Sequence, residues 1–245
     1  MCLEKGAIME KIIVANLKMN LTFDEIKKYK NEIEKQEMRN FILAPSTLYL
    51  SYLKSDKYEL CSQNGYYVDS GAFTGETSFK QLKDIVNYSL IGHSERRNNF
   101  NESYEIVSKK IDSCIENKII PILCVGENEI EKKDNLQYDK VSKEIISALK
   151  NKKIDKIIIA YEPIWAMGTG NIPKYEDIEN MCNYIKNIVK KYTKNYKIIY
   201  GGSVNSKNII DICKVDGIDG VLIGGASNDP KNIIDMYNTV KKYVK

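Results

Sequence analysis

A glutamate stands directly after a short apolar run in the second half of the chain. The run Ile157–Ala160 consists of three isoleucines and an alanine, and Glu162 follows it after a single tyrosine. Such a run predicts a strand buried on both faces, so a carboxylate at its end is placed for proton transfer. Pro163 ends the strand, and Gly168 and Gly170 give the next segment the backbone freedom of a lid. Alternatively, Glu162 caps or salt-bridges a neighbouring loop, and this stretch alone leaves both interpretations open.

Seven other apolar runs precede or follow this one at the spacing of alternating strands and helices. Between them lie segments with apolar residues every three or four positions, which predict amphipathic helices. Thr22 with Glu25, and Ser78 with Gln81, match the capping box that starts a helix, and Pro230 follows the N-cap residue Asp229. The eight predicted strands are Ile12–Ala15, Phe41–Ala44, Tyr58–Cys61, Ser89–Ile91, Ile119–Val125, Ile157–Ala160, Ile198–Tyr200 and Val221–Ile223.

Eight strand-and-helix units in 245 residues predict an α/β fold, a closed eight-stranded parallel (β/α)8 barrel. The whole chain, 1–245, would then be a single domain. The alternative is a doubly wound open sheet. That fold usually has fewer strands, and for a dinucleotide it needs a G-x-G-x-x-G motif after the first strand, which this chain lacks.

In such a barrel the C-terminal ends of all strands meet at one mouth, so the polar residues that follow the runs form one set. Besides Glu162, this set contains His93 after the fourth run, and Asn16 and Lys18 after the first. A base, an imidazole and a cation together suit acid–base chemistry on a polarised carbonyl. A lone histidine is more often structural, and Lys18 resembles many surface lysines, so only their positions at strand ends favour catalysis.

Paired glycines follow the last two runs, Gly201-Gly202 before Ser203, and Gly224-Gly225. Their exposed N–H groups, with the start of a helix near Asp229, would bind an anion, and barrel enzymes often hold a phosphate here. Either pair alone could simply make a tight turn. The presence of both favours a phosphate site.

Composition excludes several classes of function. The chain is 43% hydrophobic and 29% charged, and its net charge of +4 comes from dispersed lysines among acidic residues, which argues against a nucleic-acid groove. No apolar run approaches a membrane span or the core of a signal peptide, so we expect a cytoplasmic protein. Six cysteines without C-x-x-C spacing and a single histidine argue against zinc and indicate free thiols.

Five sequence blocks carry a family resemblance. They are Asn16–Asn20, Ile91–Arg97, Ala160–Gly170, Tyr200–Val204 and Leu222–Ser227. In this order and spacing, over nearly its whole length, the chain resembles the triosephosphate isomerase family.

The resemblance implies interconversion of dihydroxyacetone phosphate and D-glyceraldehyde 3-phosphate through an enediol, in glycolysis and gluconeogenesis. Glu162 would remove the proton next to the carbonyl, and a neutral His93 would polarise that carbonyl. Lys18 would stabilise the negative charge, with Asn16 positioning it. These roles are the ones known for this family, whose active site is a standard example of tuned pKa values. The spacing of the residues alone does not assign them. No metal or cofactor is implied.

The same resemblance assigns the substrate phosphate to backbone N–H groups of Gly168, Ser203, Gly224 and Gly225. Lid closure would exclude water and protect the enediolate. Apart from the resemblance, the charged run Glu95-Arg96-Arg97 after His93 is expected to form ion pairs that support the site.

The segment Gln63–Ser78 predicts a partner. It is too long and too aromatic for a free loop, so we expect it to dock into a second copy of the chain. The resemblance implies a homodimer in which Phe73 lies at the interface and Thr74 reaches the partner's active site.

The chain also departs from the family pattern. Leu17, Leu21 and Ser46 replace a common tryptophan, glycine and proline, but none removes a reacting group. Asn171-Ile172-Pro173 replaces the customary hinge after the lid. Of all the properties that the resemblance implies, the motion of the lid is therefore the one it supports least. Residues 1–8 precede the usual start and are expected to be an N-terminal overhang, with Met9 the more natural first residue.

Two other functions fit a barrel. A Schiff-base aldolase would share the phosphate site but needs a lysine near the barrel centre, where this chain has Glu162. A barrel retained only for binding would be expected to lose at least one of Lys18, His93 and Glu162, and all three are present.

Overall fold

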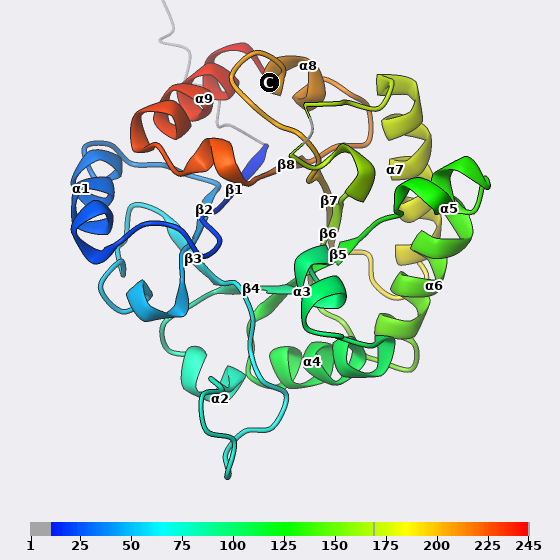
Figure 1. Ribbon diagram of the computed structural model, residues 1–245, viewed down its shortest axis with the longest axis horizontal. Coiled ribbons are helices and arrows are strands. Elements are labelled where there is room, and N and C mark those ends of the chain that lie inside the picture. Colours follow the sequence, from blue (N-terminus) through cyan, green and yellow to red (C-terminus); the bar gives the residue numbers. More distant parts are fainter. Residues whose placement is uncertain (1–10, 169, 245) are drawn as a thin grey trace, which may run out of the picture.

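The computed structural model describes residues 11–168 and 170–244, so the expected overhang at 1–8 lies outside the described residues. Eight parallel strands close into a barrel in the order of the sequence, and β1 pairs with β8 through Ile12 and Gly220. The helices form a ring around them (Figure 1). The strands are β1 (Ile12–Asn16), β2 (Phe41–Ala44), β3 (Glu59–Ser62), β4 (Tyr88–Ile91), β5 (Ile120–Val125), β6 (Ile157–Tyr161), β7 (Tyr196–Tyr200) and β8 (Gly220–Ile223).

The predicted barrel is therefore confirmed, and the open sheet is wrong because the sheet has no free edge. All eight predicted strands are present, with ends displaced by at most two residues. The largest displacement is in β7, which begins at Tyr196 because Tyr196 and Lys197 pair with Ile157 and Ile158 of β6. Polar residues inside a strand hide its end from an analysis based on apolar runs.

The helices begin where the capping signals place them. The Thr22–Glu25 and Ser78–Gln81 capping boxes both form, and Pro230 occupies the first turn of the last helix. Between β2 and β3 the structure has only a 3₁₀ helix, Thr47–Tyr49. The α-helices are α1 (Phe23–Ile33), α2 (Phe79–Leu82), α3 (Ser94–Asn99), α4 (Tyr104–Glu116), α5 (Glu129–Lys133), α6 (Gln137–Leu149), α7 (Tyr175–Val189), α8 (Ile209–Cys213) and α9 (Pro230–Tyr243).

Two apolar layers hold the barrel rigid. One fills its interior with side chains such as Val14, Ile122 and Ile158, and the other lies between the strands and the helix ring. Burying one such side chain stabilises a fold by roughly 1.5–3 kcal/mol. The packing of these two layers therefore fixes the positions of the strand ends at the mouth, independently of the functional side chains there.

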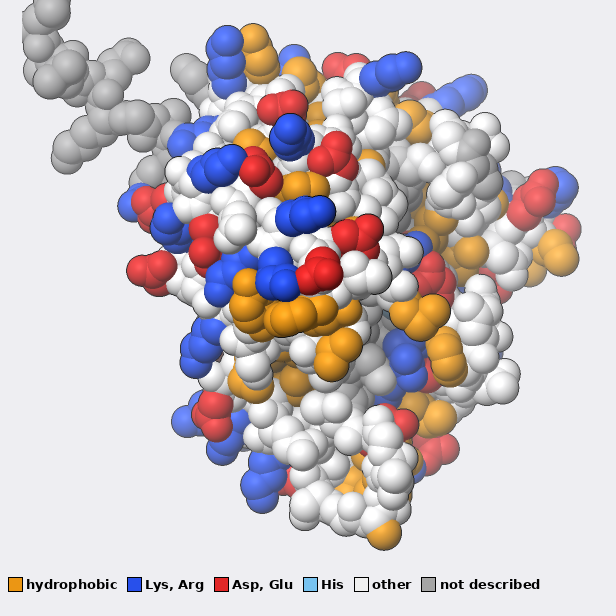
Figure 2. Space-filling view, turned by 60° about the vertical axis from the view of Figure 1, so that its left-hand side comes forward, with side chains coloured by type: hydrophobic (Ala, Val, Ile, Leu, Met, Phe, Trp, Pro, Cys, Tyr) orange, Lys and Arg blue, Asp and Glu red, His pale blue; other side chains and the backbone are white. Residues whose placement is uncertain are grey.

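The outer surface on the α1 side carries an apolar patch. Phe23 and Tyr52 pack edge to face with ring centroids 5.1 Å apart, and Lys27 and Lys30 lie over their rings. Figure 2 shows hydrophobic side chains gathered on this face below a zone of mixed charge. Of the helices in 11–168 and 170–244, none has the length and apolar character that crossing a membrane requires.

Candidate active site

A cavity of about 510 Å³ opens at the C-terminal ends of the strands. Its lining comes from the ends of β1, β4, β6, β7 and β8 and the loops that follow them, all at one mouth of the barrel. All nine residues that the sequence nominates line it: Asn16, Lys18, His93, Glu95, Glu162, Gly168, Ser203, Gly224 and Gly225.

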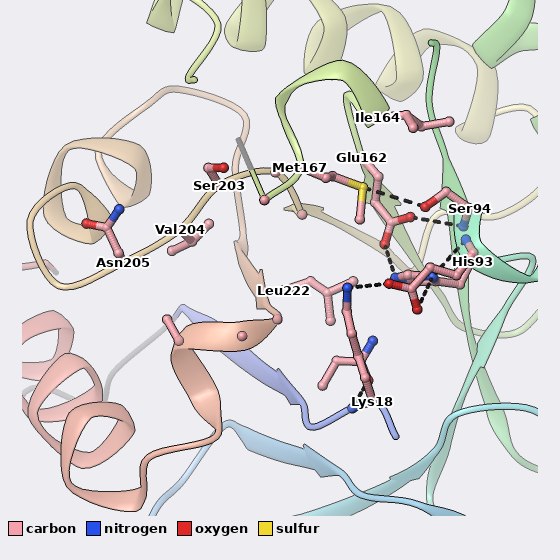
Figure 3. A pocket seen from close by; sticks show the side chains of 18 of the residues that line it. Lys18, His93, Ser94, Glu162, Ile164, Met167, Ser203, Val204, Asn205 and Leu222 are labelled. Carbon is pink, nitrogen blue, oxygen red and sulfur yellow. Dashed lines mark hydrogen bonds and ion pairs between the residues drawn. The ribbon is translucent and has the colours of Figure 1, made fainter. Parts of the chain in front are cut away.

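The central pair is Glu162, from the end of β6, and His93, from the end of β4. Glu162 is 1% exposed and His93 5%. Oε1 of Glu162 lies 3.4 Å from Nε2 of His93, and Oε2 accepts a long hydrogen bond of 3.5 Å from the N–H of Ser94 (Figure 3). Among the residues that the structure describes, Oε1 accepts no hydrogen bond. A buried carboxylate with one free oxygen facing a cavity is equipped to accept a proton.

The imidazole is oriented by the helix that follows it. His93 is the N-cap of α3, and its Nδ1 accepts a hydrogen bond of 3.2 Å from the N–H of Glu95. An acceptor nitrogen carries no proton, so a neutral ring has its N–H at Nε2, which points toward Glu162. The turn before it needs Gly92, whose φ is +69°, because a Cβ there would lie 2.7 Å from the Arg97 guanidinium.

Lys18 is held in an unusual backbone conformation. Its φ is +53°, a region that costs a non-glycine residue energy. Its N–H donates to Oδ1 of Asn16 at 3.0 Å, and Gln63 donates to its carbonyl oxygen at 2.8 Å. Its ammonium forms an ion pair with Glu95. Asn16 and Gln63 therefore aim the Lys18 side chain into the cavity, a function of Gln63 that sequence reasoning missed.

The glycine loops after β7 and β8 also line the cavity, with Gly201 next to the Glu162 side chain and Gly224 next to that of Lys18. The 3₁₀ helix Gly225–Ser227 begins at the cavity, whereas Asp229 caps α9 through the N–H of Lys231 and does not line it. The helix near Asp229 therefore starts outside the cavity lining, and the short helix starts within it. Ser203 donates a hydrogen bond of 2.6 Å from Oγ to the carbonyl of Ala166, which joins the loop after β7 to the segment after β6.

Glu127, two residues beyond β5, is a second buried carboxylate at the mouth, and its role gave no signal in the sequence. Its Oε1 accepts hydrogen bonds from Nε1 of Trp165 at 2.8 Å and from Oη of Tyr161 at 3.2 Å. Burial raises the pKa of Glu127, and the hydrogen bond from Trp165 partly offsets that rise. Glu127 therefore anchors the start of the segment after β6, which is expected from the sequence to act as a lid.

The ion pairs expected around the sequence Glu95-Arg96-Arg97 are confirmed. Besides the pair of Lys18 with Glu95, Arg96 pairs with Glu102, and Nε of Arg97 lies 3.6 Å from Oε1 of Glu144. In the described part of the chain, no three His, Cys, Asp or Glu side chains come close enough together to hold a metal ion.

Comparison with known proteins shows which family the chain matches. The family model described as triosephosphate isomerase matches residues 11–240. The triosephosphate isomerase of Mesomycoplasma hyopneumoniae (strain 232) is 41% identical over 236 residues, which cover 91% of this chain and 96% of the relative. Those of Finegoldia magna and Aquifex aeolicus are each 39% identical, covering 93% and 91% of this chain and 97% of each relative. The chain belongs to the triosephosphate isomerase family.

Proposed function

We propose that Glu162, His93 and Lys18 carry out the reaction of this enzyme, which is an isomerase, a triosephosphate isomerase of glycolysis and gluconeogenesis. The observation that carries this proposal is the buried Oε1 of Glu162, which accepts no hydrogen bond from a described residue and faces Nε2 of His93 across the cavity. No cofactor takes part in the proposed steps.

The proposed reaction begins when Glu162 accepts a proton from C1 of dihydroxyacetone phosphate. Nε2–H of His93 donates to the carbonyl oxygen on C2, so that charge builds on an oxygen facing a hydrogen-bond donor. The ammonium of Lys18 stabilises the resulting enediolate, and Asn16 holds Lys18 in its aimed conformation. His93 moves protons between the two oxygens, and Glu162 returns its proton to C2 to give D-glyceraldehyde 3-phosphate.

The phosphate lies, in this proposal, against backbone N–H groups of Gly168, Ser203, Gly224 and Gly225. Support comes from their place in the lining of one cavity and from the start of the 3₁₀ helix at Gly225, since helix N-termini favour anions. Because Gly168 belongs to the segment anchored by Glu127 and Ser203, binding there would couple the lid to the substrate.

Isotope exchange tests the assignment of the base. In D₂O, the wild-type enzyme is expected to place deuterium at C2 of the product, because the abstracted proton exchanges before it returns. Glu162→Gln keeps the shape but cannot accept a proton, so exchange and turnover should fall together. An unchanged exchange rate in that variant would remove Glu162 from the role. Borohydride added with substrate should leave the enzyme active, whereas an aldolase acting through a Schiff base would be trapped.

We also propose that the enzyme is a homodimer joined through Gln63–Ser78. The segment leaves the helix ring beside α2 (Figure 1), and Tyr66 and Phe73 pack inside it with centroids 4.8 Å apart. Phe73 is 42% exposed, and Met19 and Leu48, on the loops after β1 and β2, are 95% and 78% exposed. Large apolar side chains exposed to this extent favour a partner surface.

Sedimentation of the enzyme at micromolar concentration tests the dimer. The wild type should sediment as a dimer, and Phe73→Asp should shift it toward monomer with a loss of activity, because Thr74 would no longer complete the partner's site. A fully active wild-type monomer would contradict this proposal.

The five described cysteines are free and buried, which supports our further proposal that the single domain 1–245 works in the reducing cytoplasm.

A further inference from the structure

A third buried carboxylate lies near the active site, in the helix ring rather than at a strand end. Glu144 belongs to α6 and is 2% exposed. Its Oε2 accepts a hydrogen bond of 2.9 Å from the N–H of Gly126, the residue after β5. A buried charge is costly unless it is paired, so its partners should explain why it is there.

The partners of Glu144 reach two strand ends. Oε1 lies 3.6 Å from Nε of Arg97 and 3.5 Å from Nζ of Lys140. Arg97 in turn donates to the carbonyl of Gly92 at 2.7 Å and to that of Cys124 at 3.3 Å. Glu144 therefore ties together the end of β4, next to His93, and the end of β5.

The backbone held by Glu144 lies directly against the base. A Cβ on Gly126 would lie 1.8 Å from the carbonyl oxygen of Glu162, and the N–H of Glu162 donates to the carbonyl of Val125 at 2.8 Å. The turn at Gly126 therefore cannot shift without moving Glu162. Moreover, one cavity of about 10 Å³ is lined by Arg97, Glu144 and Glu162 together, so the charges of this group act on the base over a short path.

We propose that Glu144 is a positioning residue for Glu162, fixing the base through Gly126 and offsetting the positive charge of Arg97 beneath it. This inference rests on the proposed role of Glu162. It assigns to α6 a part in the reaction although no residue of α6 touches the substrate cavity.

The charged and titratable groups around the base define what a change at Glu144 would do. His93 faces Glu162 from β4, Arg97 from α3, the Cys124 thiol from β5, and the Lys18–Glu95 pair from across the mouth. Burial raises the pKa of Cys124 well above its ordinary value, so this thiol stays neutral.

Around Glu144 itself, Lys140 is shared with Glu131, 3.3 Å away, and lies over the ring of Tyr104. Burial raises the pKa of Glu144, and Arg97 opposes that rise. Removing the negative charge of Glu144 leaves Arg97 less compensated, which favours the ionised form of Glu162 and weakens it as a base.

The test compares the pH dependence of kcat/KM in variants of the full-length enzyme. Glu144→Gln keeps an acceptor for the Gly126 N–H but loses the charge. We expect its kcat to fall about threefold to tenfold and the acidic limb of its profile to move to lower pH by about half to one unit. Asp139→Asn, the same charge change on the exposed side of α6, should leave the profile unchanged.

A purely structural role for Glu144 would lower the melting temperature of Glu144→Gln and leave the acidic limb in place, and that result would overturn the inference. Should Glu144→Gln not fold, Lys140→Gln decides, because it leaves Glu144 in place and should move the limb slightly to higher pH. An unmoved limb would again overturn the inference. Glu162→Gln in the same assay separates the two proposals. If Glu162→Gln is inactive and the acidic limb of Glu144→Gln does not move, only the role of Glu144 is refuted. If Glu162→Gln is fully active, the role of Glu162 is refuted.

Discussion

Glu127 and Glu162 follow neighbouring strands, β5 and β6, and each is 1% exposed. They differ in what their oxygens face. Oε1 of Glu127 takes hydrogen bonds from Trp165 and Tyr161, and its Oε2, like Oε1 of Glu162, accepts none from a described residue, but Glu127 does not line the substrate cavity. Glu162 lines it, takes one long hydrogen bond from the N–H of Ser94, and turns its other oxygen toward His93. Burial alone therefore does not identify a base; a buried carboxylate with an acceptor oxygen left free at the cavity does.

The largest difference between the two glutamates should be in turnover. Glu162→Gln is expected to lower kcat by roughly a hundredfold to ten-thousandfold or more, the usual loss for a general base, with folding intact. Glu127→Gln keeps an oxygen for both of its donors and should lose less than about tenfold, since only the charge of a hydrogen-bond acceptor changes. Steady-state kinetics of both variants measures the contrast, and equal losses would erase the distinction drawn here.

A smaller effect should distinguish the two residues that donate hydrogen bonds to Glu127, Trp165 and Tyr161. Trp165 lies in the proposed lid segment, in the 3₁₀ helix Ile164–Ala166, whereas Tyr161 is the last residue of β6. Trp165→Phe removes the donor on the proposed lid, so kcat/KM should fall roughly tenfold, the equivalent of about 1.4 kcal/mol. Tyr161→Phe removes the donor on the fixed side and should cost about 1 kcal/mol of stability with kcat within about twofold of wild type. If both variants change only stability, Glu127 does not control the lid.

The smallest effect concerns stability against pH. Burial raises the pKa of Glu127 above its ordinary value of 4.5, so the folded state holds this proton more tightly than the unfolded chain. The penalty for ionising Glu127 is absent below pH 4.5, grows as pH rises, and is complete above the raised pKa. Glu127→Gln cannot ionise, so its free energy of unfolding should rise relative to wild type between pH 4.5 and pH 8. Urea unfolding at pH 4.5 and at pH 8 measures this difference in the free energy of unfolding, with Glu116→Gln, a change at an exposed residue, as control. If the free energy of unfolding of Glu127→Gln fell relative to wild type as pH rises, the burial argument would be contradicted.

Most of the fold could be predicted from the sequence because strand and helix signals are local. The runs of isoleucine, the Thr22 and Ser78 capping boxes and the glycine pairs each act within a few residues, and together they led to a barrel and to the residues at its mouth. Strand ends with polar residues, such as Tyr196 and Lys197, carry no such signal. Their pairing depends on the neighbouring strand.

The supporting contacts could not be predicted because they join residues far apart in the chain. Gln63 reaches the carbonyl of Lys18, Trp165 reaches Glu127, and Glu144 reaches Gly126 from the outer ring. Glu144 in particular resembles any other acidic residue of an amphipathic helix until the packing of α6 against the barrel buries it. Such contacts depend on packing that composition and spacing do not encode.

The protonation state of His93 tests the central claim most directly, because the proposed reaction needs a neutral imidazole with its proton on Nε2, facing Glu162. His93 is the only histidine in the chain, so ¹⁵N-labelled histidine gives signals from this ring alone. At pH 7 the account predicts that Nδ1 is unprotonated, as required by the hydrogen bond from the N–H of Glu95, and that Nε2 carries the proton. A ring protonated on both nitrogens, or on Nδ1 alone, would contradict the account.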